Sequence, residues 1–108
     1  MEKNTGAFIC DENAFNRILS LEKRRGDKFI FMVISFDNLL EETLLEEIFE
    51  ELVILLRTKD VVTKSGKQIF LLLNNANLIY GEDIVRRLNN LFDDEYPEIK
   101  PIFTLKNF

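Results

Sequence analysis

Histidine is absent from this chain of 108 residues, and cysteine occurs once. Without imidazole, the chain lacks the commonest general base, the commonest metal ligand and every catalytic triad that depends on histidine. The single cysteine, Cys10, excludes an internal disulfide. Because Cys10 ends the apolar run 7–10, we expect a small packed side chain there rather than a nucleophile. An enzyme of this composition would have to use carboxylates, lysines or a metal ion.

Basic residues are also in short supply, since 14 lysines and arginines face 19 aspartates and glutamates, for a formal net charge of -5. Nucleic acids and anionic lipid surfaces are held by a basic field, so we expect neither as a partner. No segment has the roughly 20 apolar residues of a membrane span. The start of the chain has no apolar core of a signal peptide. We therefore expect a cytoplasmic domain with no membrane contact of its own.

Hydrophobic periodicity predicts a regular order of elements after an N-terminal helix, namely β, α, β, β, α, β. Asp11 or Asn13 is expected to cap the first helix, and Asn38 the second, which should be the longest in the chain. Ser65 and Gly66 supply the turn of a hairpin. The expected elements are helices at 12–24, 39–57 and 82–93 and strands at 28–37, 61–64, 68–73 and 101–106, with a loop at 74–81.

This order predicts an α+β, ferredoxin-like βαββαβ fold with an extra N-terminal helix and an antiparallel sheet that carries helices on one face. The runs 29–36 and 68–73 are the most apolar and should form the central strands. The third strand then runs antiparallel beside the first, so its start should lie near residues 35–37. We expect any site at that junction.

A carboxylate at a strand end, facing a glycine turn, is what a two-metal nucleotidyl transfer site requires. This chain supplies only Asp37, because Lys67, Gln68 and Ile69 across the turn cannot serve as anionic metal ligands. We therefore predict no catalytic residues, no metal and no cofactor.

The long predicted helix carries six glutamates largely opposite its apolar stripe, and two interpretations stay open. They mark either a partner surface or an ordinary solvated face. The six are Glu41, Glu42, Glu46, Glu47, Glu50 and Glu51.

Arg57-Thr58-Lys59-Asp60 is followed after five residues by Gly66-Lys67-Gln68-Ile69-Phe70. This stretch, 57–70, resembles the GGDEF domain of diguanylate cyclases, in which an RxxD pair precedes the signature hairpin by that spacing. Residues 33–38, VISFDN, are similar to the family's first strand, and the resemblance covers about residues 11–106. Residues 5–25 look like the first helix of GGDEF modules in multidomain bacterial regulators. The resemblance thus implies one domain over 1–108, with residues 1–10 as a lead-in, taken from a longer regulatory protein.

The chain departs from the family where the chemistry is done. Its metal-binding acids fall on Ser35 and Gln68, the adjacent acid falls on Ile69, and Asp37 matches the second acid of the first strand. The interval 35–66 is shorter than the family's by roughly ten residues, about three helical turns. It lacks the segment that carries the guanine-contacting residues. The resemblance therefore implies a degenerate hairpin at Gly66, Lys67, Gln68, Ile69 and Phe70 and a protein that is not an enzyme.

The RxxD pair itself is retained as Arg57 and Asp60, which in the family resembles an inhibitory site for cyclic di-GMP. Arginine can bridge a guanine in a bidentate fork while a carboxylate accepts from its N–H groups. Two readings stay open, a receptor site or a helix end followed by a strand start. Arg86 and Arg87 are either helpers or solvated. We predict a non-catalytic regulatory or interaction module of bacterial signalling, with other protein domains or a second copy as partners, and a cyclic di-GMP receptor as the alternative.

Overall fold

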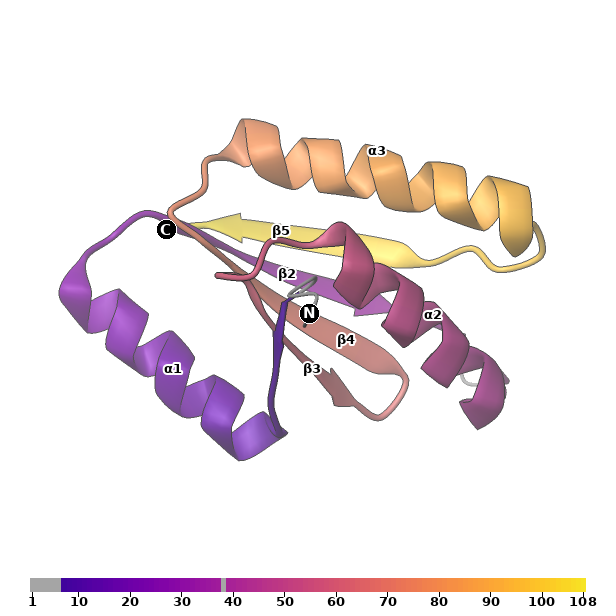
Figure 1. Cartoon of the computed structure of the whole chain (residues 1–108), viewed down its shortest axis with the longest axis horizontal. Helices are drawn as coiled ribbons and strands as arrows, with labels where there is room; N and C mark the ends of the chain where they lie inside the picture. The colour runs from indigo at the N-terminus through magenta and orange to yellow at the C-terminus, as the bar shows by residue number, and fades with distance from the viewer. Residues whose placement is uncertain (1–6, 38) are drawn as a thin grey trace, which may run out of the picture.

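The computed structural model describes residues 7–37 and 39–108. Its elements in chain order are β1 (Phe8–Ile9), α1 (Glu12–Arg25), β2 (Phe29–Ser35), α2 (Glu42–Leu55), β3 (Val61–Ser65), β4 (Gln68–Asn74), α3 (Leu78–Glu95) and β5 (Ile102–Asn107). The strands form one sheet in the order β1-β3-β4-β2-β5, with the helices around it (Figure 1). The predicted α+β, ferredoxin-like arrangement is confirmed.

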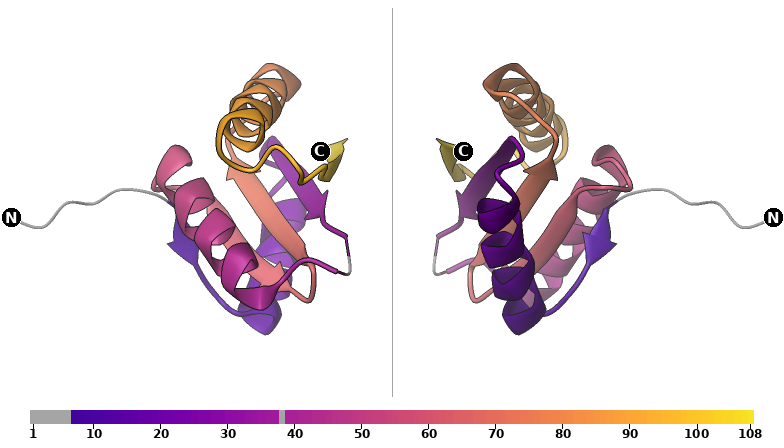
Figure 2. Two further views of the ribbon diagram at one scale, coloured as in Figure 1. Left: turned by 90° about the vertical axis from the view of Figure 1, so that its right-hand side faces the viewer. Right: turned by 90° about the vertical axis from the view of Figure 1, so that its left-hand side faces the viewer.

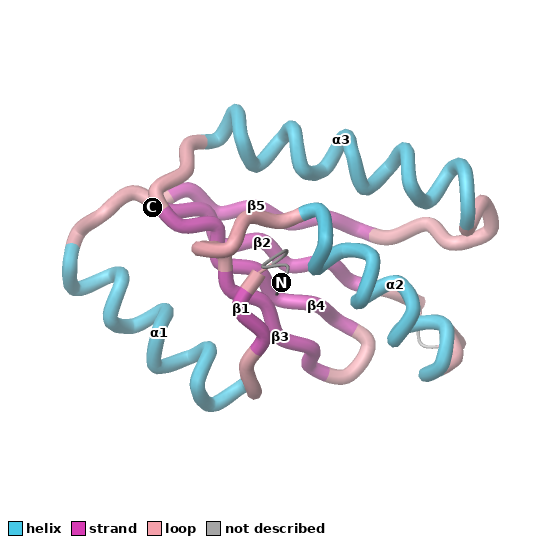
Figure 3. Tube along the Cα trace, in the orientation of Figure 1, coloured by secondary structure: helices cyan, strands magenta, loops and turns pink. Residues whose placement is uncertain are grey.

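The central strands are β2 and β4, as their apolar composition predicted. They pair antiparallel from Phe29 opposite Asn74 to Ser35 opposite Gln68. At the edge, the short β1 runs parallel to β3, so the sheet is mixed rather than wholly antiparallel. Figure 3 shows β1 lying along β3. This strand was not predicted, because two residues of Phe8–Ile9 carry no detectable periodicity and form a strand only through bonds to residues 60–62.

The helices lie on both faces of the sheet (Figure 2). The expectation of one helical face holds for α2 and α3, which bury Ile48, Leu52, Ile84 and Leu88 against alternate residues of β2 and β4. The extra helix α1 covers the opposite face, where Phe15 is fully buried in a second cluster with Phe29, Val61 and Leu72. Cys10 is partly buried at the edge of that second cluster, and burial raises the pKa of its thiol.

The lengths of the two later helices were predicted wrongly. α2 has 14 residues and begins at Glu42, because the Asp37 carboxylate accepts from the backbone N–H of Leu39 at 2.8 Å in a turn that precedes it. The predicted cap Asn38 lies outside the described residues. α3 has 18 residues and is the longer helix, since Asn77 caps it through the N–H of Tyr80 at 3.1 Å. Residues 78–81 are therefore helix and not loop.

Two glycines are required by the local geometry of the fold. Gly81 lets α3 approach β5 closely, because a Cβ at this position would lie 2.9 Å from Leu105 Cδ2. Gly66 makes the hairpin turn with a φ of 61°, in the left-handed region that favours glycine. Across the described ranges 7–37 and 39–108, no helix has both the length and the apolar character needed to cross a membrane.

Candidate functional site

The predicted junction between the end of β2 and the start of β4 is present in the structure, and the two side chains that meet there are uncharged. The strand register places Ser35 directly opposite Gln68. Gln68 Nε2 donates a hydrogen bond to Ser35 Oγ at 3.1 Å. Strand alternation puts both side chains on the face that α1 covers, whereas Ile69 is fully buried in the core beneath α2 and α3. An amide and a hydroxyl therefore meet at the two positions that the sequence resemblance equates with metal-binding acids.

The side chain of Lys67, the residue before Gln68, reaches the segment that leads into α2. Lys67 Nζ donates to the backbone carbonyl of Leu40 and lies 3.4 Å from the Glu42 carboxylate. The carbonyl of Lys67 accepts from the N–H of Phe36 at 3.0 Å. The Lys67 side chain thus ties Leu40 and Glu42 to the hairpin turn.

The one carboxylate predicted at the junction, that of Asp37, accepts a hydrogen bond within its own segment of the chain. Asp37 is exposed, and its side chain caps the turn that leads to α2. Within the described part of the chain, no group of three or more acidic or cysteine side chains is arranged to hold a metal ion. A cleft of about 420 Å³ adjoins the turn, lined by Phe36, Asp37, Leu39, Leu40, Glu98, Ile99 and Lys100. The junction offers hydrogen bonds and a local positive charge.

The other predicted pair, Arg57 and Asp60, lies at the opposite end of β4 and forms a dense polar network. Asp60 is fully buried. Its Oδ1 lies 3.0 Å from Arg57 Nη2, and its Oδ2 accepts from the Arg57 backbone N–H at 3.0 Å. The carboxylate also accepts from the N–H of Asn74 at 3.3 Å and from the hydroxyl of Tyr80 at 3.1 Å. These bonds tie the segment after α2 to the end of β4 and the start of α3.

The Arg57 guanidinium completes the network from the outside. It donates to the Asn74 carbonyl at 2.7 Å and lies 4.0 Å from the centre of the Tyr80 ring. Burial opposes its positive charge, but the hydrogen bond and negative charge of Asp60 outweigh that effect and raise the pKa of Arg57. Burial, followed by the charge of Asp60, raises the pKa of Tyr80 to about 12. The tyrosine therefore stays a neutral hydrogen-bond donor.

The role of Arg57 and Asp60 as ligand residues stays a prediction. Arg57 keeps a side-chain exposure of 34%, so its outer edge is open, whereas the exposure of the Asp60 side chain is 0%. The helpers considered for this site are engaged elsewhere, because Arg86 and Arg87 both pair with Asp83 of their own helix. Tyr80 and Asn74 were missed by the sequence analysis. Asn77 was the signal that would have placed Tyr80 in the first turn of α3.

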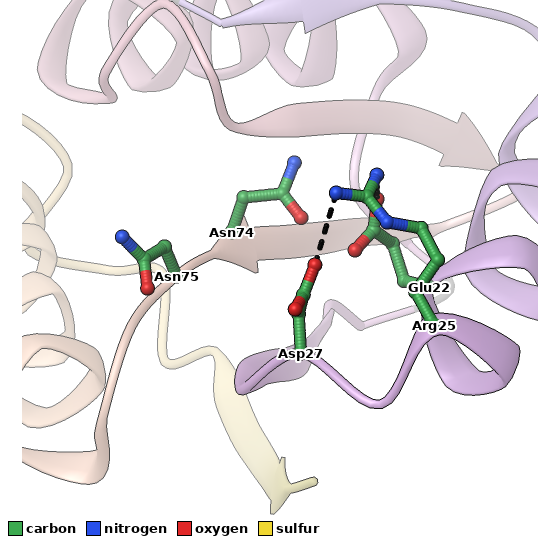
Figure 4. A pocket seen from close by; sticks show the side chains of 5 residues that line it. All are labelled: Glu22, Arg25, Asp27, Asn74 and Asn75. Carbon is green, nitrogen blue, oxygen red and sulfur yellow. Dashed lines mark hydrogen bonds and ion pairs between the residues drawn. The ribbon is translucent and has the colours of Figure 1, made fainter.

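A polar cavity of about 400 Å³ lies beside this network, between the end of α1 and the end of β4. Arg25 lies 3.2 Å from Glu22 and 3.0 Å from Asp27, with Asn74 beside the ion pair and Asn75 at the margin (Figure 4). Both acids are held by the one arginine, so the cavity presents amides and a compensated charge cluster.

Comparison with known proteins identifies the fold. A DGC protein from Thermotoga maritima has a similar crystal structure, with a TM-score of 0.74, 15% sequence identity, and coverage of 93% of this chain and 82% of that chain. No protein-family model and no curated protein matches the sequence. The likeness shows a shared α+β fold that covers nearly all of this chain.

Proposed function

We propose that this chain is a GGDEF-like domain without cyclase chemistry, which works as a regulatory or interaction module of cytoplasmic signalling in bacteria. DGC is the usual abbreviation for diguanylate cyclase, so the shared fold supports the resemblance found in residues 57–70. The observation that carries the proposal is the hydrogen bond of 3.1 Å between Gln68 and Ser35. These two residues occupy the positions of the family's metal-binding acids and contain no carboxylate.

The chemistry of phosphoryl transfer explains why this substitution matters. Magnesium is held by anionic oxygens and compensates the charge that develops on the transferred group. An amide and a hydroxyl offer only neutral oxygens, which do not neutralise a divalent cation. A module that retains the fold without this charge compensation is suited to binding other proteins rather than to turnover.

The direct test is a turnover assay of the purified chain with GTP and magnesium or manganese, with products separated by chromatography. We expect no cyclic di-GMP and no pyrophosphate above a protein-free control. An active diguanylate cyclase assayed in parallel shows that the conditions support the reaction. Metal-dependent formation of cyclic di-GMP by this chain would overturn the proposal.

A cyclic di-GMP receptor is the second candidate, and the exposed edge of Arg57 favours it. The buried Asp60 weighs against it, because both carboxylate oxygens already accept bonds within the protein. Titration calorimetry with cyclic di-GMP separates the two candidates. We expect no heat of binding. Micromolar binding that is lost in Arg57→Ala but kept in Arg86→Ala would establish the receptor instead.

A further inference from the structure

A groove lies between the outer sides of α2 and α3, which run antiparallel on one face of the sheet (Figure 1). Its volume is about 260 Å³, and its lining consists of Glu51, Ile54, Leu55, Arg87 and Leu91. Ile54 is 66% exposed, although the core-facing positions of α2 bury four other apolar residues. The floor of the groove is therefore aliphatic and accessible to a partner.

The α2 side of the groove is acidic. α2 contains five glutamates and no lysine or arginine over Glu42–Leu55. Glu42 and Glu46 pair with lysines of the hairpin. Within the described residues, Glu47 and Glu51 form no salt bridge with a basic side chain. Arg87 also lines the groove and lies 3.0 Å from Asp83, a carboxylate that it shares with Arg86.

The α3 side repeats this pattern at its C-terminal end. The last turn of α3 holds Asp93, Asp94 and Glu95 and no basic residue, although a helix C-terminus favours cations. The negative charge of Glu51 on α2 raises the pKa of Glu95 at the end of α3. Tyr96 donates its hydroxyl to Glu51 at 3.0 Å and bridges the same two helices. The apolar floor of the groove thus lies beside Glu51 and the acidic C-terminal end of α3.

Acidic residues at the C-terminal end of a helix are unfavourable because that end of the helix dipole is negative. Binding of a cationic partner relieves this unfavourable arrangement. We infer that the groove between α2 and α3 docks a basic amphipathic helix of another protein. The apolar side of that helix covers Ile54 and Leu91, and its lysines or arginines meet Glu47, Glu51 and Glu95. A third helix fits a groove between two helices because its side chains pack between theirs. This inference rests on the proposed role as an interaction module and names the chemistry of the partner.

The probe for the test is a fluorescently labelled lysine–leucine peptide of about 14 residues, four turns of amphipathic helix. A glutamate–leucine peptide with the same leucine spacing is the negative control. Fluorescence anisotropy should give saturable binding of the lysine peptide alone. We expect Ile54→Asp, and separately the pair Glu47→Lys with Glu95→Lys, to weaken binding by about tenfold or more, which is about 1.4 kcal/mol.

Matched control variants keep the test specific. Ile79→Asp changes an equally exposed isoleucine at the other end of α3, and Glu82→Lys reverses a charge there. Both should leave the affinity within about twofold. Circular dichroism of each variant establishes that it is folded.

Three results would overturn the inference. They are no binding of the lysine peptide, equal weakening by the Ile79→Asp and Ile54→Asp variants, or self-association of the chain through the groove in sedimentation. Failure here leaves the non-catalytic role intact, whereas GTP turnover by the chain would overturn that role whatever the peptide does.

Discussion

The two ends of β4 hold polar residues of different kinds, a neutral pair at its start and a buried charged network at its end. At its start, Gln68 makes one neutral side-chain hydrogen bond with Ser35. At its end, Asn74 belongs to a network in which the buried Asp60 accepts from the backbone and side chain of Arg57 and from Tyr80. The difference is one of charge, because a neutral pair needs few partners whereas a buried carboxylate must have its oxygens satisfied.

This contrast separates the two stretches whose sequence resembles motifs of the GGDEF family. The start of β4 corresponds in this resemblance to the signature hairpin, and the two side chains that meet there are uncharged. The end of β4 keeps the charged RxxD pair, and the fold itself uses Asp60 to join three segments. Retention of a motif at this end therefore has a structural explanation that does not depend on a ligand.

The largest expected effect comes from breaking the network at Asp60. Asp60→Ala leaves Arg57 without its counter-charge and several donors without an acceptor, so we expect the free energy of unfolding to fall by about 3–5 kcal/mol. Urea denaturation measures this change. The control is Asp27→Ala, which removes an exposed ion pair with Arg25 and should cost about 0.5 kcal/mol. Equal losses in both variants would refute a structural role for Asp60.

A smaller effect is expected at Tyr80. Tyr80→Phe removes the hydroxyl that donates to Asp60, which should cost about 1 kcal/mol. The folded pKa of about 12 lies above the ordinary value of 10.0 because burial and the Asp60 charge favour the neutral phenol. This contribution to stability is therefore complete below pH 10 and is lost as the pH rises to about 12.

Unfolding curves between pH 8 and 12 test this dependence of stability on pH. The expected change in the free energy of unfolding is about that of the pKa shift of one group. Stability of the wild-type chain should fall over that range more steeply than stability of Tyr80→Phe. Tyr96→Phe is needed in parallel, since burial and the hydrogen bond to Glu51 also raise the pKa of Tyr96 to about 12. Identical profiles for the wild-type chain and Tyr80→Phe would contradict the prediction.

The smallest effect is expected at the start of β4. The double variant Ser35→Asp with Gln68→Glu places two carboxylates opposite each other, and their repulsion should cost about 0.5 kcal/mol without metal. Millimolar magnesium should then raise the melting temperature of this variant, because carboxylate oxygens are its preferred ligands. Thermal unfolding with and without magnesium measures the effect. The control is Ser35→Asn, which together with the native Gln68 gives neutral side chains of the same shape as those of the double variant. Magnesium should not raise its melting temperature.

Much of the fold could be predicted because it follows from local patterns. The runs 29–36 and 68–73 are apolar without interruption, so their central position in the sheet followed from composition. Their antiparallel pairing then placed Gln68 near Ser35. The short β1 and the first turn of α3 were missed, since the former depends on bonds to residues 60–62 and the latter on the Asn77 cap.

By itself the sequence determined the order of elements and the absence of acids at Ser35 and Gln68, since both depend on residue type and spacing along the chain. Only the tertiary structure decided which polar groups are buried together. It brought Arg57, Asp60, Asn74 and Tyr80 from three segments into one network, and it joined Glu51 of α2 to Tyr96 at the acidic end of α3. Burial and the approach of distant segments decide whether a charged side chain pairs within the fold or is available to a ligand. Neither can be predicted from neighbouring residues in the sequence.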